Sequence, residues 1–224
     1  MISQPSIYDN LTVLIGSDIK ALAHSFSISI DLANVLEDMA YLTAFVDATR
    51  PISHMAQDVT FRDTTYFNDQ RASIEDRILT MAGDEDKRQG ICKAQNVQEP
   101  CRLAALIYIN MVFRELQPRA AIHTTLTSCL RAELMQMNLV SCSGNLGAAL
   151  LWILFVGGAV AVEEPIRSWF VSTLTLICSQ LELQSWHDTK GSLLRYLWSD
   201  RIWEERCKKL WFDVLDKQRD KLRY

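Results

Sequence analysis

The sequence has few residues that interrupt helices. It contains 8 glycines and 5 prolines in 224 residues, and long stretches have neither. Gly and Pro are the strongest local breakers of regular structure, so their scarcity favours long helices over many short strands and turns. No β-hairpin signal, internal repeat or low-complexity tract is visible. With 49% hydrophobic residues, the chain is long enough to bury one sizeable core, and we expect one domain.

The chain also lacks the spacings typical of metal sites and catalytic centres. None of its 6 cysteines lies in a C-x-x-C pair, and its 4 histidines include no H-E-x-x-H motif. Cys129, Cys178 and Cys207 are expected on apolar helical faces as buried free thiols. Cys101 and His123 could form a nucleophile pair, but no third group is in place to orient the imidazole. We therefore predict no catalytic residue, no cofactor and no metal.

Basic charge is scarce as well. The formal net charge is −4 and the pI is near 5.6, which is unlike the basic excess of nucleic-acid-binding domains. Basic residues near the C-terminus alternate with Asp213, Asp216 and Asp220, which is typical of a solvated amphipathic helix. The first ten residues have no basic residue and no long apolar run. No signal peptide is predicted, and we expect an intracellular protein with reduced cysteines.

One stretch has no polar face. Residues 146–162, LGAALLWILFVGGAVAV, are strictly apolar. Such a helix must be covered on every side by protein or by lipid. The uncharged run between Glu133 and Glu163 is long enough to span a bilayer, so a membrane-anchored helical protein is one alternative. We favour a buried central helix, because the strictly apolar part is shorter, contains Gly157 and Gly158, and has no flanking cluster of Lys or Arg. The glycine pair predicts close approach of another helix backbone.

Hydrophobic residues at helical spacing predict an all-α fold, a single domain of about seven to eight helices around this central one. The clearest patterns lie in residues 28–50, 69–83, 100–117, 120–137, 146–162, 166–181, 186–197 and 199–217. Residues 51–69 are polar and aperiodic and are predicted to connect two helices. Residues 1–27 are expected to be loosely ordered, and the helical domain to cover 28–224. The charged, glycine-containing segment near 83–99 is expected to be a mobile loop.

Tryptophan is the residue type that could line a binding site. Most of the 6 tryptophans fall on helical core stripes, where ordinary packing explains them. Trp169, Trp203 and Trp211 are the candidate residues of a pocket or partner surface, provided that their faces are not wholly covered. A helical enzyme with an unrecognised pocket is therefore an alternative function.

Three segments resemble a known family in the order in which they occur. They are CRLAALIYINMVFREL at 101–116, LLWILFVGG with the following RSWFVSTL at 150–174, and LWSDRIWEERCKKLW at 197–211. All three are similar to segments of the fungal-specific transcription factor regulatory domain, the all-helical region found C-terminal to the binuclear zinc cluster of fungal regulators. The C-x-x-C units, basic linker and coiled coil that precede that region in the family do not occur in this sequence.

The resemblance implies a regulatory or interaction domain of a fungal transcription regulator, without its own DNA-binding zinc cluster. It provides no catalytic residue, and we predict no enzyme activity. The acidic charge and the missing zinc ligands predict no direct nucleic-acid binding by this chain, and the buried-helix interpretation predicts no membrane association. The implied partners are proteins of a transcription complex, with a small-molecule effector and a homodimer as further options. The implied location is the nucleus, with the cytoplasm as the alternative.

Overall fold

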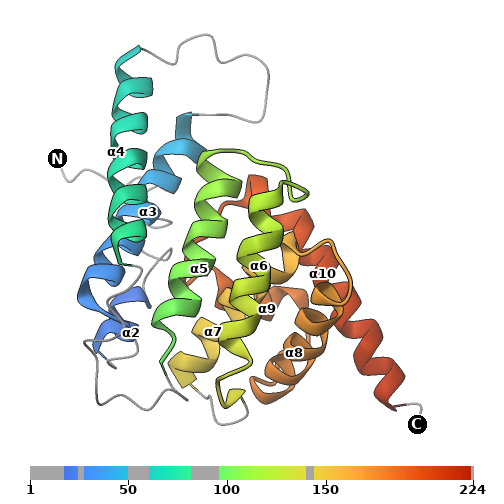
Figure 1. Cartoon of the computed structure of the whole chain (residues 1–224). Helices are drawn as coiled ribbons and strands as arrows, with labels where there is room; N and C mark the ends of the chain where they lie inside the picture. Colours follow the sequence, from blue (N-terminus) through green and yellow to red (C-terminus); the bar gives the residue numbers. More distant parts are fainter. Residues whose placement is uncertain (1–17, 25–27, 50–60, 82–95, 140–143, 223–224) are drawn as a thin grey trace, which may run out of the picture.

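The computed structural model describes residues 18–24, 28–49, 61–81, 96–139 and 144–222. These residues form nine α-helices, one short π-helical segment and no strand, which confirms the predicted all-α fold (Figure 1). In chain order the helices are α2 (Ile19–His24), α3 (Ile30–Thr49), α4 (Phe61–Thr80), α5 (Gln98–Tyr108), α6 (Ala121–Leu134), α7 (Gly144–Val160), α8 (Ile166–Gln180), α9 (Trp186–Leu193) and α10 (Asp200–Leu222), with the π-helical segment η3 (Ile109–Phe113) directly after α5.

Helix α7 is the centre of the bundle. Every residue from Gly147 to Gly158 is buried, and α7 contacts α2, α5, α6, α8, α9 and α10. Protein therefore covers the helix that has no polar face. Within the described ranges, no helix is both long enough and apolar enough to pass through a bilayer.

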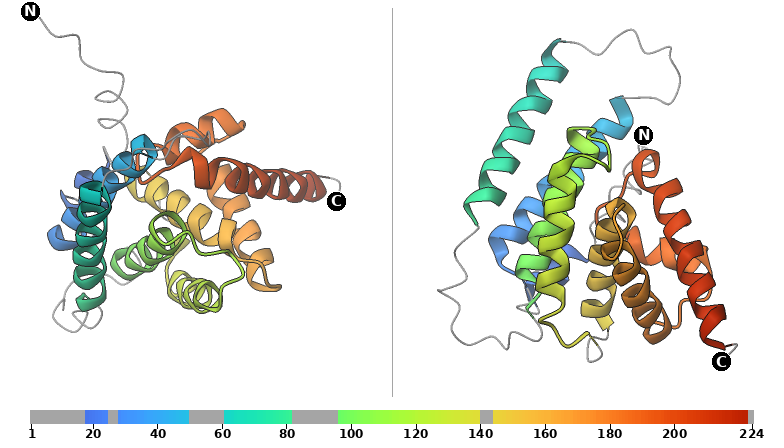
Figure 2. Two further views of the ribbon diagram at one scale, coloured as in Figure 1. Left: turned by 90° about the horizontal axis from the view of Figure 1, so that it is seen from above. Right: turned by 45° about the vertical axis from the view of Figure 1, so that its right-hand side comes forward.

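The two ends of the bundle are formed by α3–α4 and by α10. The α3–α4 hairpin lies at one edge of the molecule, and α10 lies at the opposite edge, with its last turns running beyond the other helices (Figure 2). The buried stripe of α10 ends at Val214, which agrees with this projection.

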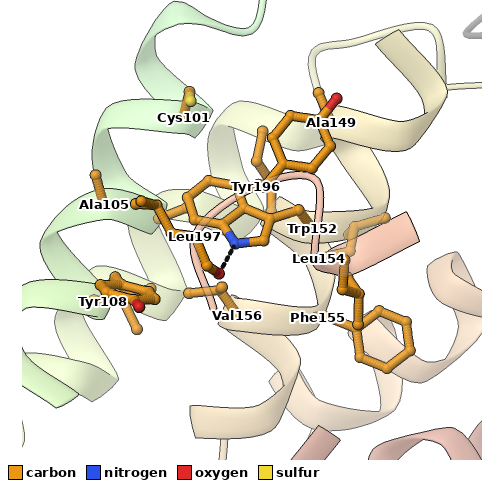
Figure 3. Packing of buried hydrophobic residues seen from close by; sticks show 14 of the residues in the cluster. Cys101, Ala105, Tyr108, Ala149, Trp152, Leu154, Phe155, Val156, Tyr196 and Leu197 are labelled. Carbon is orange, nitrogen blue, oxygen red and sulfur yellow. Dashed lines mark hydrogen bonds between the residues drawn. The ribbon is translucent and has the colours of Figure 1, made fainter. Parts of the chain in front are cut away.

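Trp152 ties α7 to the turn before α10. Its side chain is 2% exposed, and its indole Nε1–H donates to the carbonyl of Leu197 at 2.9 Å (Figure 3). The indole also stacks on Tyr196, with ring centroids 6.0 Å apart. The Tyr196 hydroxyl in turn donates to the carbonyl of Asn145. Both buried aromatic side chains thus satisfy their polar atoms, as burial requires.

The glycine pair in α7 makes room for side chains of three neighbouring helices. A Cβ atom at Gly157 would lie 2.8 Å from Leu130 on α6 and 2.8 Å from Phe170 on α8. A Cβ atom at Gly158 would lie 2.8 Å from Leu210 on α10. We expected the backbone of another helix to lie close to the glycine pair. That prediction was wrong, because the nearest atoms belong to large side chains. Close contact at the pair itself is confirmed.

Helix α7 ends against an arginine. Arg167 donates from Nη1 to the carbonyls of Gly158, at 2.7 Å, and Ala161, at 3.3 Å. Its Nη2 atom pairs with Asp213 on α10. The last carbonyls of a helix have no partner within the helix, and a cation near them also favours the negative end of the helix dipole. One side chain therefore caps α7 and joins it to α10.

Helix α4 is longer than the sequence pattern predicted. It begins at Phe61, although residues 51–69 were expected to be a polar connection. Its buried hydrophobic residues are Phe67, Ile74 and Ile78, which form a narrow stripe along an otherwise polar helix. A stripe this narrow gives a weak periodic signal, so the first turns were missed.

The two segments expected to be loosely ordered are partly helical. In the N-terminal segment 1–27, Ile19 and Leu22 are each 1% exposed on α2, which packs against α3 and α7. In the loop predicted near 83–99, Gln98 and Glu99 belong to the first turn of α5. Residues 1–17, 25–27 and 82–95 lie outside the described residues.

The glycine pair gives a test of the packing around α7. Gly158→Leu should lower the free energy of unfolding by about 1 to 3 kcal/mol or more, because Leu210 and Phe170 leave no space for the new side chain. Chemical denaturation of the purified protein measures the change.

Gly191→Leu is the matched control, because a Cβ atom at Gly191 in α9 meets nothing within 4 Å. This variant should be at least as stable as the wild type, since Leu is the better helix former. Equal stabilities of the two variants would contradict close packing at Gly158.

Candidate functional site

The three candidate tryptophans differ in how much of their side chains is exposed. Trp203 and Trp211 lie on α10 with exposed fractions of 1% and 2%, so both are core residues that a partner cannot reach in this conformation. Trp169 on α8 is half-buried and packs edge-on against Phe170, with centroids 5.1 Å apart. The guanidinium carbon of Arg131 lies 6.0 Å from the Trp169 ring centroid, within cation–π range. Of the three, only Trp169 is partly open to a partner.

Trp203 belongs to a chain of aromatic rings that crosses the domain. It stacks on Tyr108 of α5, with centroids 5.6 Å apart and an interplanar angle of 28°. Tyr108 meets Phe113 edge-on at 6.0 Å, and Phe113 meets Phe67 of α4 edge-on at 6.2 Å. The chain of rings therefore connects α10, α5, η3 and α4.

Two polar contacts accompany these rings and reach α3. The Thr43 hydroxyl donates to the carbonyl of Met39 at 2.7 Å, so it accepts from the Tyr108 hydroxyl at 3.1 Å. Burial raises the pKa of Tyr108, which keeps the phenol protonated as a donor. Near the start of α10, the Ser199 hydroxyl donates to Asp47 at 2.8 Å. Desolvation raises the pKa of Asp47, and the bond from Ser199 opposes that effect.

The π-helical segment supports the same junction. Directly after η3, the Arg114 N–H donates to the carbonyl of Ile109, five residues earlier. Asn110, 8% exposed, donates from its side chain to the carbonyl of Leu106 at 2.9 Å. Single turns of π-helix occur frequently at functional positions. The sequence offered one signal for this segment, an Asn within the apolar stripe of the predicted helix.

An ion pair links α4 to the end of η3, and a hydrogen bond links it to α5. Arg114 forms a bidentate ion pair with Glu75, with N–O distances of 2.8 and 2.6 Å. Arg102 pairs with Glu99 in α5 and also donates to the carbonyl of Ile78 at 3.4 Å. The hairpin is thus attached to the bundle by these polar contacts and the Phe67–Phe113 ring contact, in addition to buried apolar residues of α3 and α4 that belong to the same hydrophobic core as α7.

Three buried cysteines have thiols that resist ionisation. Burial raises the pKa of Cys101 and of Cys178 to about 12, and it also raises the pKa of Cys207. A thiol must ionise to act as a nucleophile or metal ligand, so these three groups behave as apolar core residues. In the part of the chain that the structure describes, no group of three or more His, Cys, Asp and Glu side chains is placed to hold a metal ion.

Helix α6 buries Leu126, Leu130 and Leu134 at the predicted helical spacing, but its other buried residues are polar. His123 and Thr127 are buried, with exposed fractions of 1% and 2%. Ile122 is 43% exposed, and Cys129 is exposed rather than buried as expected. Both buried residues are polar but hydrogen-bonded: the Thr127 hydroxyl donates to the carbonyl of His123, and His123 donates from Nδ1 to the carbonyl of Gln117 at 3.0 Å. Apolar residues alone therefore predict the buried leucines of α6 and misplace Ile122 and Cys129.

A small cavity lies between α6 and the turn that joins α7 to α8. Its volume is about 10 Å³, and its lining includes Thr124, Thr127, Val160, Glu163 and Ile166. A cavity of this size holds about one water molecule. It therefore has no room for a small-molecule effector.

Burial of His123 gives a prediction for pH. Desolvation lowers the pKa of His123 below its ordinary value of 6.5. At pH values between the lowered pKa and 6.5, the imidazole is therefore neutral in the folded protein and protonated in the unfolded chain. The stabilising effect is complete above pH 6.5 and is lost as the pH falls toward the lowered value. The free energy of unfolding falls through this effect by at most about 1.4 kcal/mol per pH unit.

His123→Asn keeps an N–H donor for Gln117 and removes the titrating group, so its stability should fall less steeply with acid than that of the wild type. Denaturant unfolding at a series of pH values measures both slopes. Exposed His187→Asn is the control and should follow the wild type. Parallel slopes for wild type and His123→Asn would show that His123 is not held neutral.

The comparison with protein families identifies the domain. The model described as the fungal specific transcription factor domain matches residues 39–222, from the middle of α3 to the end of α10. No curated protein and no solved structure is significantly similar to the chain. The family is one of transcription regulators and not one of enzymes. Because the match covers most of the sequence, the chain belongs to the fungal-specific transcription factor domain family.

Proposed function

We propose that this chain is the regulatory, partner-binding domain of a fungal transcription regulator and that it acts in the nucleus without binding DNA itself. The observation that carries the proposal is the family match over residues 39–222. The acidic net charge of −4 supports the part that concerns DNA, because duplex binding depends on basic side chains that neutralise phosphates.

Regulation by a partner requires two arrangements that the partner distinguishes. An effector shifts an equilibrium only by its difference in affinity for the two states. The α3–α4 hairpin is our candidate for the element that changes position. Besides its buried apolar contacts, its links to the rest of the domain include Arg114–Glu75 and Ser199–Asp47, polar contacts that water can replace more readily than it can replace apolar ones.

The proposed absence of DNA binding can be tested directly. The purified chain should not retain promoter DNA selectively in a gel-shift experiment at near-physiological salt, because no basic element is present to contact phosphates and base edges. Sequence-selective and salt-sensitive retention would contradict this part of the proposal.

The regulatory role can be tested with a reporter gene. A fusion of this chain to a heterologous DNA-binding domain should change the reporter output in a fungal host, because the domain recruits or contacts regulatory proteins. A second fusion that lacks residues 83–95 tests the contribution of the segment that precedes α5. The matched control is the fusion that carries Gly158→Leu, in which the packing around α7 is disturbed.

The wild-type fusion should activate or repress, and the Gly158→Leu fusion should have a much weaker effect at equal protein level. A wild-type fusion that leaves the reporter unchanged would contradict the regulatory role. An effect of equal size in the Gly158→Leu fusion would show that the folded domain is not what acts.

A further inference from the structure

We infer that the outer face of the α3–α4 hairpin is a docking surface for a basic segment of a partner protein. The inference deepens the proposed function, on which it rests, by naming the surface and the chemistry of the partner. We call the surface the seam; it consists of Asp38, Tyr41, Phe45, Tyr66, Ser73 and Arg77.

Two contacts fix the register of the hairpin at the seam. Asp38 pairs with Arg77, and Phe45 meets Tyr66 edge-on with centroids 5.4 Å apart. Residues 38, 41 and 45 follow i, i+3, i+7 spacing on α3, and residues 66, 73 and 77 follow i, i+7, i+11 spacing on α4. Such spacings place residues on one face of a helix, so Tyr41 and the exposed Ser73 lie between the two contacts.

The seam carries unusually exposed aromatic side chains. Tyr41 is 67% exposed and Tyr66 is 52% exposed. Ile30, which precedes Tyr41 by about three helical turns and so shares its face of α3, is 71% exposed. The edge-on contact with Phe45 supports the Tyr66 ring on one side and leaves the rest open. Tyrosine is enriched at interface hot spots because it combines a large apolar area with a polar tip.

The charge of α3 indicates the partner. This helix carries Asp31, Glu37, Asp38 and Asp47 and no Lys or Arg. Glu37 is paired with Lys20, but the Lys20 side chain is 71% exposed, and exposed ion pairs are weak. Exposed tyrosine faces next to Asp31 and the weakly paired Glu37 favour Lys and Arg, which bind ring faces by cation–π contact and carboxylates by ion pairs, whereas Asp38 is already paired with Arg77.

The same charge disfavours the other occupants. Nucleic acid would bring phosphates against the carboxylates of α3. A second copy docked about a two-fold axis on this face would bring one hairpin against the other, and acidic residues outnumber basic residues in both α3 and α4, so like charges would meet. A basic peptide segment of another protein is the occupant that complements both the aromatic and the acidic part of the surface.

A peptide library tests the inference with the full chain. The probe is a phage-displayed library of random peptides of about 16 residues, long enough for about four helical turns. The enriched peptides should carry net positive charge, and a synthetic copy of the strongest one should bind the wild-type protein with an affinity that falls as salt rises, measured by fluorescence anisotropy.

Three variants locate the binding. Tyr41→Ser with Tyr66→Ser should weaken the synthetic peptide about tenfold or more, as expected when hot-spot aromatics are removed. Asp31→Asn with Glu37→Gln should weaken it and flatten the salt dependence. The control is Phe212→Ser with Asp216→Asn on α10, where Phe212 is 53% exposed at the opposite edge of the molecule; it should bind as the wild type does (Figure 2).

Several results would overturn the inference. They are enrichment of neutral or acidic peptides, no enrichment at all, equal loss of binding in the seam and control variants, or a wild-type dimer in sedimentation that dissociates in the Tyr41→Ser, Tyr66→Ser variant. Each can occur while the reporter fusion still acts, so failure of this inference is distinguishable from failure of the regulatory role.

Discussion

The need to bury a helix without a polar face determines the architecture of this domain. The apolar run in α7 cannot leave any side in water, and a single layer of helices cannot cover it. The chain meets this constraint by surrounding α7 with α2, α5, α6, α8, α9 and α10. Polar atoms in that core form hydrogen bonds with other groups of the protein. Trp152 donates to the carbonyl of Leu197, and Arg167 donates to the carbonyl of Gly158 at the end of α7.

The contacts of the α3–α4 hairpin at the edge of the domain differ from those around α7. The interior of the bundle is closed by large apolar side chains at short range, such as Leu130, Phe170 and Leu210 around the glycine pair. The α3–α4 hairpin shares the hydrophobic core through side chains such as Leu32 and Met39, but α4 packs mainly against α3 and α5, and hydroxyl bonds, ion pairs and a line of aromatic rings make up further links to the bundle. Polar contacts of this kind give geometric specificity with a smaller net free energy, because water competes for the same groups. A rigid centre with a more weakly attached edge is the arrangement that regulation by a binding partner requires.

The structural features that depend on strong hydrophobic periodicity could be predicted from the sequence. The central helix, the helices on either side of it and the buried stripe of α10 follow from apolar residues at helical spacing, and the family followed from three segments in order. The beginning of α4 was missed because Phe67, Ile74 and Ile78 form a narrow stripe. Ile122 and Cys129 of α6 were expected in the core and are exposed, because the polar residues His123 and Thr127 are buried in their place.

The candidate site was less predictable than the fold for a physical reason. Trp203 was singled out as an aromatic residue that could meet a ligand, but its ring is covered by Tyr108, a contact between residues 95 positions apart in the chain. The junction around it joins four helices and a π-helical segment, and no local pattern encodes such distant pairings. The exposed tyrosines of the seam carried no sequence signal either, since exposure follows from which faces the other helices leave uncovered.

The central claim is that an apolar bundle around α7 forms the stable part of the domain and that α3–α4 opens separately from it. Hydrogen–deuterium exchange of the intact protein, followed by mass spectrometry of peptic fragments, tests this claim most directly. The account predicts that amides of α7 exchange only through global unfolding, while those of α4 exchange faster, through an opening of lower free energy that leaves α7 protected. Exchange of α4 and α7 with the same free energy of opening would contradict it, because the hairpin would then be an inseparable part of the core.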